Sequence, residues 1–173
     1  LLQIAEVGKR DLQLKLERGS LHQLIHTLKD SFQAKVEANS GKILLDLQAS
    51  EDRIQADQLH LQNILFNLID NSFKYSPESP HIEIRSRDEA NGPILEIQDQ
   101  GVGIPKEFQK SVFERFFRIP TGNVHNVKGF GLGLFYVKQI CDAHGWNIQL
   151  GSEEGKAPGF KFYSVNTYVC DNS

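Results

Sequence analysis

The sequence contains no methionine and only two cysteines, Cys141 and Cys170, among its 173 residues. Two thiols so far apart give no disulfide framework, and they suit a reducing compartment. Cys141 and His144 are three residues apart, but two ligands do not make a zinc site, so a buried thiol is the simpler interpretation. Because the chain starts at Leu1 instead of methionine, we expect it to be a piece of a longer protein.

Long apolar runs and an excess of one charge are also lacking. No run approaches the roughly 18 residues of a membrane-spanning helix, and no secretory signal precedes the first polar segment. The net charge of −3 does not indicate a nucleic acid or a membrane surface as the main partner. A G-x-x-x-x-G-K-[ST] element is missing too, which excludes a P-loop nucleotide site. The length fits one globular domain that needs no covalent staple.

Hydrophobic periodicity predicts an α+β domain, a mixed sheet of about five or more strands covered by three helices on one face. The helices are predicted from Ser20, with Gln23 in a capping box, to Asn39–Gly41, from Asp57 to near Tyr75, and from Leu132 to His144. The strands are predicted at Leu12–Leu16, 42–48, 53–56, 81–87, 94–99, 147–151 and 160–169. The apolar face of the second helix comprises Leu59, Leu61, Ile64, Leu65, Leu68 and Ile69.

The second predicted helix carries a polar face. Asn67, Asn71 and Lys74 follow at i, i+4 and i+7, opposite its apolar stripe. A neutral amide oxygen is a suitable ligand for Mg²⁺, and an ammonium group three residues further on can meet a phosphate. Taken alone, an ordinary solvated helix face explains the pattern as well.

A glycine-rich turn follows the strand predicted at 94–99, where Asp99 precedes Gly101 and Gly103. A carboxylate in this position can accept a hydrogen bond from an exocyclic amino group such as that of adenine. The glycines allow the backbone to pass close to a flat ring and to adopt a positive φ. A plain β-turn is the alternative.

An aromatic segment runs from Phe113 to Arg118. Its aromatic side chains are expected to anchor one side of the loop at 119–129, which leaves Arg115 or Arg118 able to reach a phosphate. The alternative is a pair of exposed arginines that bind no ligand.

Glycines open the last predicted helix, at Gly129, Gly131 and Gly133. Unsatisfied N–H groups at a helix start, with glycines that permit close approach, form an anion site. The segment is not a dinucleotide fingerprint, because that pattern needs glycine where Leu134 stands and a strand directly before it.

In this order the four segments, Asn67–Tyr75, Asp99–Gly103, Phe113–Arg118 and Gly129–Gly133, resemble the N, G1, F and G2 boxes of histidine kinase catalytic domains. The resemblance covers about residues 12–165. It implies the two-layer α/β sandwich of the histidine kinase, gyrase and chaperone superfamily. It also implies ATP and Mg²⁺ as cofactors, and transfer of the γ-phosphate to a histidine of another domain.

The resemblance assigns roles position by position. Asn71 resembles the Mg²⁺-binding asparagine, supported by Asn67 one turn earlier, and Lys74 and Arg118 resemble residues that meet the phosphates during transfer. Tyr75 resembles a residue near the ribose and base. Phe117 replaces a frequent tyrosine, so any hydroxyl contact there is lost. The remaining implied binding residues are Asp99 for the adenine amino group, Gly101, Gly103, Ile104, Phe113, Lys128, Gly129, Phe130, Gly131, Leu132, Gly133 and Leu134, with 119–128 as the ATP lid.

The histidine that accepts phosphate is not recognisable here. None of the six histidines, at 22, 26, 60, 81, 125 and 144, precedes the Glu and Arg-Thr-Pro-like run that the family has. We therefore expect residues 1–11 to be a remnant of the dimerisation helices or linker and 12–170 to be the catalytic domain. The partners implied are the protein's own dimerisation domain and a response regulator receiver domain, with no nucleic acid. The parent is then expected to be a homodimeric, membrane-anchored bacterial sensor, with this domain in the cytoplasm.

Three alternatives share the fold by resemblance. The ATPases of the gyrase, chaperone and mismatch-repair branch carry a glutamate where Asn67 stands, and an amide cannot act as a base. A nucleotide-binding regulator without phosphotransfer would keep the same motifs. An anti-sigma-type serine kinase usually stands alone, which fits a truncated start less well.

Overall fold

The computed structural model describes residues 12–76, 79–90, 92–120, 129–153 and 160–166. Its elements, in chain order, are β1 (Leu16–Ser20), α2 (Leu21–Glu37), β2 (Lys42–Leu47), β3 (Arg53–Asp57), α3 (Gln58–Lys74), β4 (His81–Glu89), β5 (Gly92–Asp99), the short 3-10 helices η1 (Lys106–Phe108) and η2 (Ser111–Phe113), α4 (Gly133–Ala143), β6 (Asn147–Glu153) and β7 (Phe160–Asn166). The three predicted helices are confirmed, and the strands predicted at 81–87 and 94–99 pair as an antiparallel hairpin.

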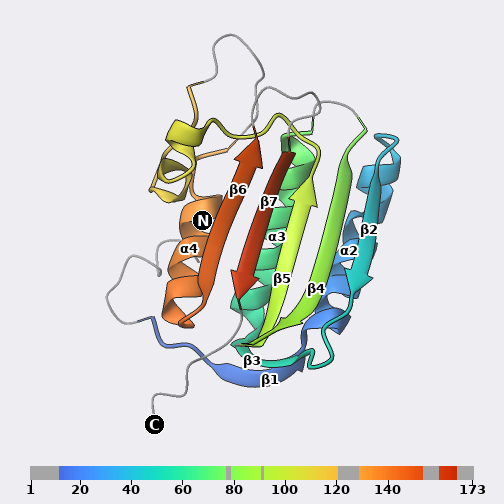
Figure 1. Cartoon of the computed structure of the whole chain (residues 1–173), viewed down its shortest axis with the longest axis vertical. Coiled ribbons are helices and arrows are strands. Elements are labelled where there is room, and N and C mark those ends of the chain that lie inside the picture. Colours follow the sequence, from blue (N-terminus) through green and yellow to red (C-terminus); the bar gives the residue numbers. More distant parts are fainter. Residues whose placement is uncertain (1–11, 77–78, 91, 121–128, 154–159, 167–173) are drawn as a thin grey trace.

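The main sheet has five strands in the order β2-β4-β5-β7-β6. Strand β2 runs parallel to β4, and the other neighbours are antiparallel, so the sheet is mixed as predicted. Helices α2, α3 and α4 all lie on one face of it (Figure 1). The fold is therefore the two-layer α+β sandwich that the sequence predicts, and β1 and β3 form a separate two-stranded sheet at one end.

Helix α3 lies at the centre of the helical layer. It starts at Gln58 because the Asp57 side chain accepts the His60 N–H at 3.1 Å and so caps the first turn. Its buried stripe comprises Leu61, Ile64, Leu65, Leu68, Ile69 and Ser72. Each buried leucine or isoleucine stabilises the fold by about 1.5–3 kcal/mol relative to exposure. The stripe thus fixes which face of α3 remains for polar residues.

Two details of the predicted elements are wrong. The strand expected at Leu12–Leu16 lies at Leu16–Ser20 instead, because backbone pairing with β3 determines its position and Leu16 itself is 43% exposed. Leu59, expected on the apolar face of α3, is 55% exposed. It precedes Phe66 by seven residues, and that spacing puts both on the outward side of the helix.

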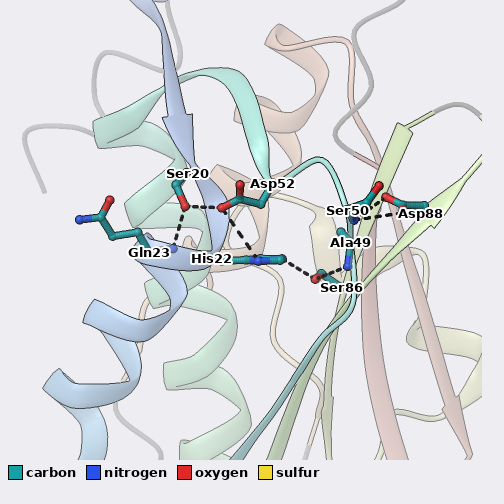
Figure 2. A network of polar contacts seen from close by, with 8 residues as sticks. All are labelled: Ser20, His22, Gln23, Ala49, Ser50, Asp52, Ser86 and Asp88. Atoms are coloured by element: carbon teal, nitrogen blue, oxygen red, sulfur yellow. Dashed lines mark hydrogen bonds and ion pairs between the residues drawn. The ribbon is translucent and has the colours of Figure 1, made fainter.

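A polar network holds the small sheet to the large one (Figure 2). Ser20 caps α2 by accepting the Gln23 N–H at 3.0 Å, and its hydroxyl donates to Asp52 beside β3. His22 lies between Asp52, 3.9 Å away, and the Ser86 hydroxyl on β4, 2.7 Å away. The network therefore fixes the start of α2 to both sheets.

A second link joins the end of α4 to the start of α3 through His144. Its Nδ1 donates to the Ile140 carbonyl at 2.8 Å, so its Nε2 is the atom that accepts the Asp57 N–H at 3.0 Å. The ring stacks on Trp146, with centroids 4.1 Å apart, and the residue is only 4% exposed. Burial lowers the pKa of His144, so the neutral ring is the stable form.

The contacts of His144 are expected to make part of the free energy of unfolding sensitive to acid. Because the folded pKa of His144 lies below its ordinary value of 6.5, the stabilisation is complete above that pH and is lost as pH falls towards the folded pKa. His144→Gln should lower the free energy of unfolding by about 1–3 kcal/mol at pH 7.5. It should also flatten the decline of that free energy between pH 7 and 5.5, measured by urea unfolding.

The matched control for this prediction is His26→Gln, since His26 is exposed on α2. It should keep the wild-type pH dependence. Of the groups around the ring, Asp57 opposes the lowered pKa and His60 supports it. An acid profile of His144→Gln that superimposes on the wild-type profile would contradict the assignment.

No helix in the described ranges combines the length and the apolar content needed to cross a bilayer.

Candidate active site

The polar face of α3 leads into the site. Asn67 and Asn71 are half-buried and Lys74 is exposed, while the predicted apolar stripe is buried apart from Leu59. The Asn67 Nδ2 donates to the Asn63 carbonyl at 2.7 Å. Its Oδ1 faces the start of α4, since a Cβ on Gly133 would come within 2.9 Å of that oxygen. Two predicted site residues, Asn67 and Gly133, are thus in direct contact.

An acidic residue that the motif analysis did not select holds Lys74. The Asp70 carboxylate lies 2.5 Å from Lys74 Nζ and 3.2 Å from Lys35 Nζ on α2. The i, i+4 spacing of Asp70 and Lys74 could have indicated the first ion pair. Nothing in the sequence indicates Lys35, which is 35 residues away. A lysine that turned towards a phosphate would leave Asp70 paired with Lys35.

Asp99 ends β5 on the side of the sheet that faces the helices, and it is fully buried. Its Oδ1 accepts the Gly101 N–H at 2.9 Å. The Val102 N–H donates to the carbonyl of Tyr75, the C-cap of α3, at 3.1 Å. A Cβ on Gly101 would lie 2.6 Å from that carbonyl oxygen and 2.8 Å from Asp99 Oδ1. Only glycine therefore permits this junction of the first two motifs.

The third and fourth motifs are joined by their backbones. The Phe116 N–H donates to the Gly131 carbonyl at 3.0 Å, and both residues are left-handed, with φ of 63° and 67°. A Cβ on Gly131 would lie 2.5 Å from the Phe117 carbonyl oxygen. Phe113 packs against the core, whereas Phe116 and Phe130 are 61% and 73% exposed. The predicted anchoring of this loop by its aromatic segment therefore involves backbone contacts as well as Phe113.

Helix α4 starts without a side-chain cap. Its N-cap residue is Leu132, whose apolar side chain makes no hydrogen bond to the first turn. The N–H groups of that turn, from Gly133 onwards, carry the positive end of the helix dipole. Leu132 is buried and Leu134 packs against the core, so the helix start is held firmly. This arrangement can bind an anion such as phosphate.

The other predicted site residues are distributed around this centre. Ile104 and Gly103 are buried, with Gly103 at φ 72°, while Gly129 and Arg118 are exposed. Lys128 and most of the predicted lid, 121–128, lie outside the described residues.

The described part of the chain contains no second arrangement suited to a hydrolase triad, a reactive thiol or a metal cluster. His22, Ser86 and Asp52 have the order of a hydrolase triad, but they belong to the structural network of Figure 2. In that network Ser86 Oγ also accepts the Ala49 N–H at 3.3 Å, and Asp52 also accepts the Ser20 hydroxyl. Burial raises the pKa of the Cys141 thiol to about 12, so this thiol is no nucleophile at neutral pH, and its predicted burial is confirmed. No three His, Cys, Asp or Glu residues in these ranges are placed to hold a metal.

Comparisons with known proteins agree with this arrangement. The family model for the histidine kinase-, DNA gyrase B- and HSP90-like ATPases matches residues 56–166. The sensor protein RprX of Bacteroides fragilis is 41% identical over 155 residues, which are 88% of this chain and 30% of RprX. The sensor histidine kinase WalK of Bacillus subtilis is 30% identical over 164 residues, which are 94% of this chain and 27% of WalK. The chain thus spans less than a third of these relatives.

Among solved structures, full-length ShkA in complex with AMPPNP superimposes with a TM-score of 0.82. The match covers 97% of this chain and 34% of ShkA at 22% identity, so it supports the fold alone.

Proposed function

The chain belongs to the histidine kinase-, DNA gyrase B- and HSP90-like ATPase family and is the ATP-binding catalytic domain of a sensor histidine kinase. From this we propose that it transfers the γ-phosphate of Mg·ATP to a histidine. That histidine lies on a separate dimerisation domain, and the domain proposed here spans residues 12–170. The observation that carries the proposal is the junction of Asp99, Gly101 and Tyr75. It puts a fully buried carboxylate beside the end of the helix that bears Asn71 and Lys74.

At the base end, Asp99 accepts a hydrogen bond from the adenine amino group. A carboxylate can only accept hydrogen bonds, so it favours adenine, which presents an amino group, over guanine, which presents a carbonyl. Gly101 and Gly103 bring the backbone close to the ring, and Ile104 supplies an apolar wall. Tyr75, at the C-cap of α3, lies at the ribose.

At the phosphate end, charge and orientation supply the catalysis. Lys74, Arg118 and the uncapped start of α4 hold the β- and γ-phosphates, and Asn67 keeps the start of α4 in place through Gly133. The amide oxygen of Asn71 suits Mg²⁺, and the described residues offer no cluster of thiols and imidazoles that would favour zinc. When bound, Mg²⁺ neutralises part of the triphosphate charge.

The transfer itself needs no covalent step on this chain. A neutral imidazole nitrogen of the dimerisation domain attacks the γ-phosphorus, the bond to the bridging oxygen breaks, and ADP leaves. Hydrolysis is disfavoured because Asn67 stands where the ATPase branch has a glutamate, and an amide cannot activate water. The parent protein is proposed to be a homodimer that passes its phosphate to a response regulator receiver domain.

Two measurements test this proposal. Calorimetry of this chain should show Mg²⁺-dependent binding of ATP, and the full-length protein should transfer ³²P from γ-labelled ATP to an acid-labile, histidine-linked form. Rapid steady-state ATP hydrolysis by this chain, without labelled protein in the full-length reaction, would favour the ATPase branch instead. Asn67→Glu should raise hydrolysis if that position alone separates the two branches.

A further inference from the structure

Ser72 on α3 differs from Thr27 and Ser31, the two hydroxyl residues of α2. It is the last residue of the buried stripe of α3, is 0% exposed, and its Oγ has no hydrogen-bond partner among the described residues. Thr27 and Ser31 on α2 satisfy their hydroxyls at carbonyls of the preceding turn, at 3.0 Å and 2.7 Å. That local bond is the usual one for a hydroxyl within a helix. Ser72 forgoes it, which costs stability because a buried polar group is left unsatisfied.

The position of Ser72 relates it to the base end of the site. Asp99 ends the buried row of β5, and Ser72 ends the buried row of α3, which packs against that strand. The C-terminal ends of α3 and β5 lie at the same edge of the domain (Figure 1). The Tyr75 carbonyl, one turn after Ser72, and Asp99 Oδ1 both lie within 3 Å of the Cβ position of Gly101, at 2.6 Å and 2.8 Å. The interface of α3 and β5 is therefore apolar along its length and polar at this end.

We propose that the Ser72 hydroxyl is a second hydrogen-bonding group for the adenine base, donating to ring nitrogen N1, directly or through one bound water. The inference rests on the proposed function, since it deepens the base site built around Asp99. Asp99 and Ser72 would bind different atoms of the purine edge. The carboxylate can only accept a hydrogen bond, which suits the amino group, whereas the hydroxyl can donate one to the neighbouring ring nitrogen. Nucleotide binding then satisfies a hydroxyl that the nucleotide-free protein leaves unpaired.

The role of Ser72 can be tested because its removal should affect stability and ATP affinity differently. Ser72→Ala should leave the nucleotide-free unfolding temperature unchanged or higher, because it removes an unsatisfied buried group. The same variant should bind Mg·ATP about 3–10-fold more weakly by calorimetry, the equivalent of one neutral hydrogen bond. The matched control is Ser31→Ala, which removes a satisfied hydroxyl on α2. It should not raise the unfolding temperature, and it should bind ATP as the wild type does.

A modified ligand identifies the atom. The wild type should bind 1-deaza-ATP, which has carbon in place of N1, about 3–10-fold more weakly than ATP. Ser72→Ala should bind the two ligands equally. Ser72→Cys, nearly isosteric and a weaker donor, gives a second variant if the alanine variant folds poorly, and it should discriminate less than the wild type.

Two results would overturn the inference while the proposed function stands. One is a Ser72→Ala protein whose affinities for ATP and 1-deaza-ATP differ by as much as those of the wild type. The other is a Ser72→Ala protein that has a lower unfolding temperature than the wild type and binds ATP unchanged, which would make the hydroxyl a structural group held by buried water. If the wild type binds no ATP at all, the proposed function fails first.

Discussion

Asp99→Asn is expected to lower the affinity for Mg·ATP by about 100-fold and to remove the preference for ATP over GTP. The Asp99 Oδ1 accepts the Gly101 N–H at 2.9 Å, so the asparagine oxygen would take that position. Its NH₂ group would then face the adenine amino group, donor against donor. A loss of this size corresponds to a hydrogen bond to a charged group together with an unsatisfied buried donor. The same NH₂ group suits the carbonyl of guanine, so GTP should lose less.

Calorimetry with both nucleotides measures the effect. Asp88→Asn is the matched control, because Asp88 is an exposed carboxylate that also accepts a backbone N–H, that of Ser50. It should leave both affinities unchanged. A correctly folded Asp99→Asn protein that still prefers ATP as strongly as the wild type would refute the role of Asp99 in reading the base.

Local patterns in the sequence carry much of the fold. Ser20 and Asp57 are each the last residue of a strand and cap the helix that begins at the next residue, so local hydrogen bonding fixes where α2 and α3 start. The misplaced β1 has the opposite cause. Leu12, Leu14 and Leu16 alternate as in a strand, but β1 is placed by its pairing with β3, a contact across more than thirty residues that no local pattern reveals. Leu59 was misassigned because the start of a helix offers too few turns to define its apolar face.

The candidate site shows the same division. The residue types at Asn71, Lys74 and Asp99 follow from the chemistry that a nucleotide demands, so their spacing is readable in the sequence. The contacts that hold them are tertiary: Asn67 against Gly133, and Lys35 against Asp70. Ser72 illustrates the limit, because a serine in a helix predicts a bond to the preceding turn, and only the packed structure shows that this bond is missing.

Two features of the backbone require glycine at position 131: its positive φ and its close approach to Phe117. Gly131→Ala should therefore be more damaging than the same substitution at Gly129 or Gly145. Its φ of 67° costs an alanine about 1–2 kcal/mol. Its Cβ would also lie 2.5 Å from the Phe117 carbonyl oxygen, a backbone atom that cannot move without breaking the bond from the Phe116 N–H to the Gly131 carbonyl. We expect the free energy of unfolding to fall by about 2–4 kcal/mol. ATP affinity should fall at least about 10-fold, because the loop before α4 is displaced.

Two other glycines separate these constraints. Gly145 has a φ of 71° with open space around its Cβ position, so Gly145→Ala should cost the strain alone, about 1–2 kcal/mol, and leave ATP affinity unchanged. Gly129 has neither a positive φ nor an atom within 4 Å of that position, so Gly129→Ala should change the free energy of unfolding by less than about 0.5 kcal/mol. Urea unfolding of the three variants should therefore rank them 131, 145, 129. Equal losses at 131 and 145 would mean that the contact with Phe117 yields easily, and the junction of the two motifs would then not hold the phosphate end of the site.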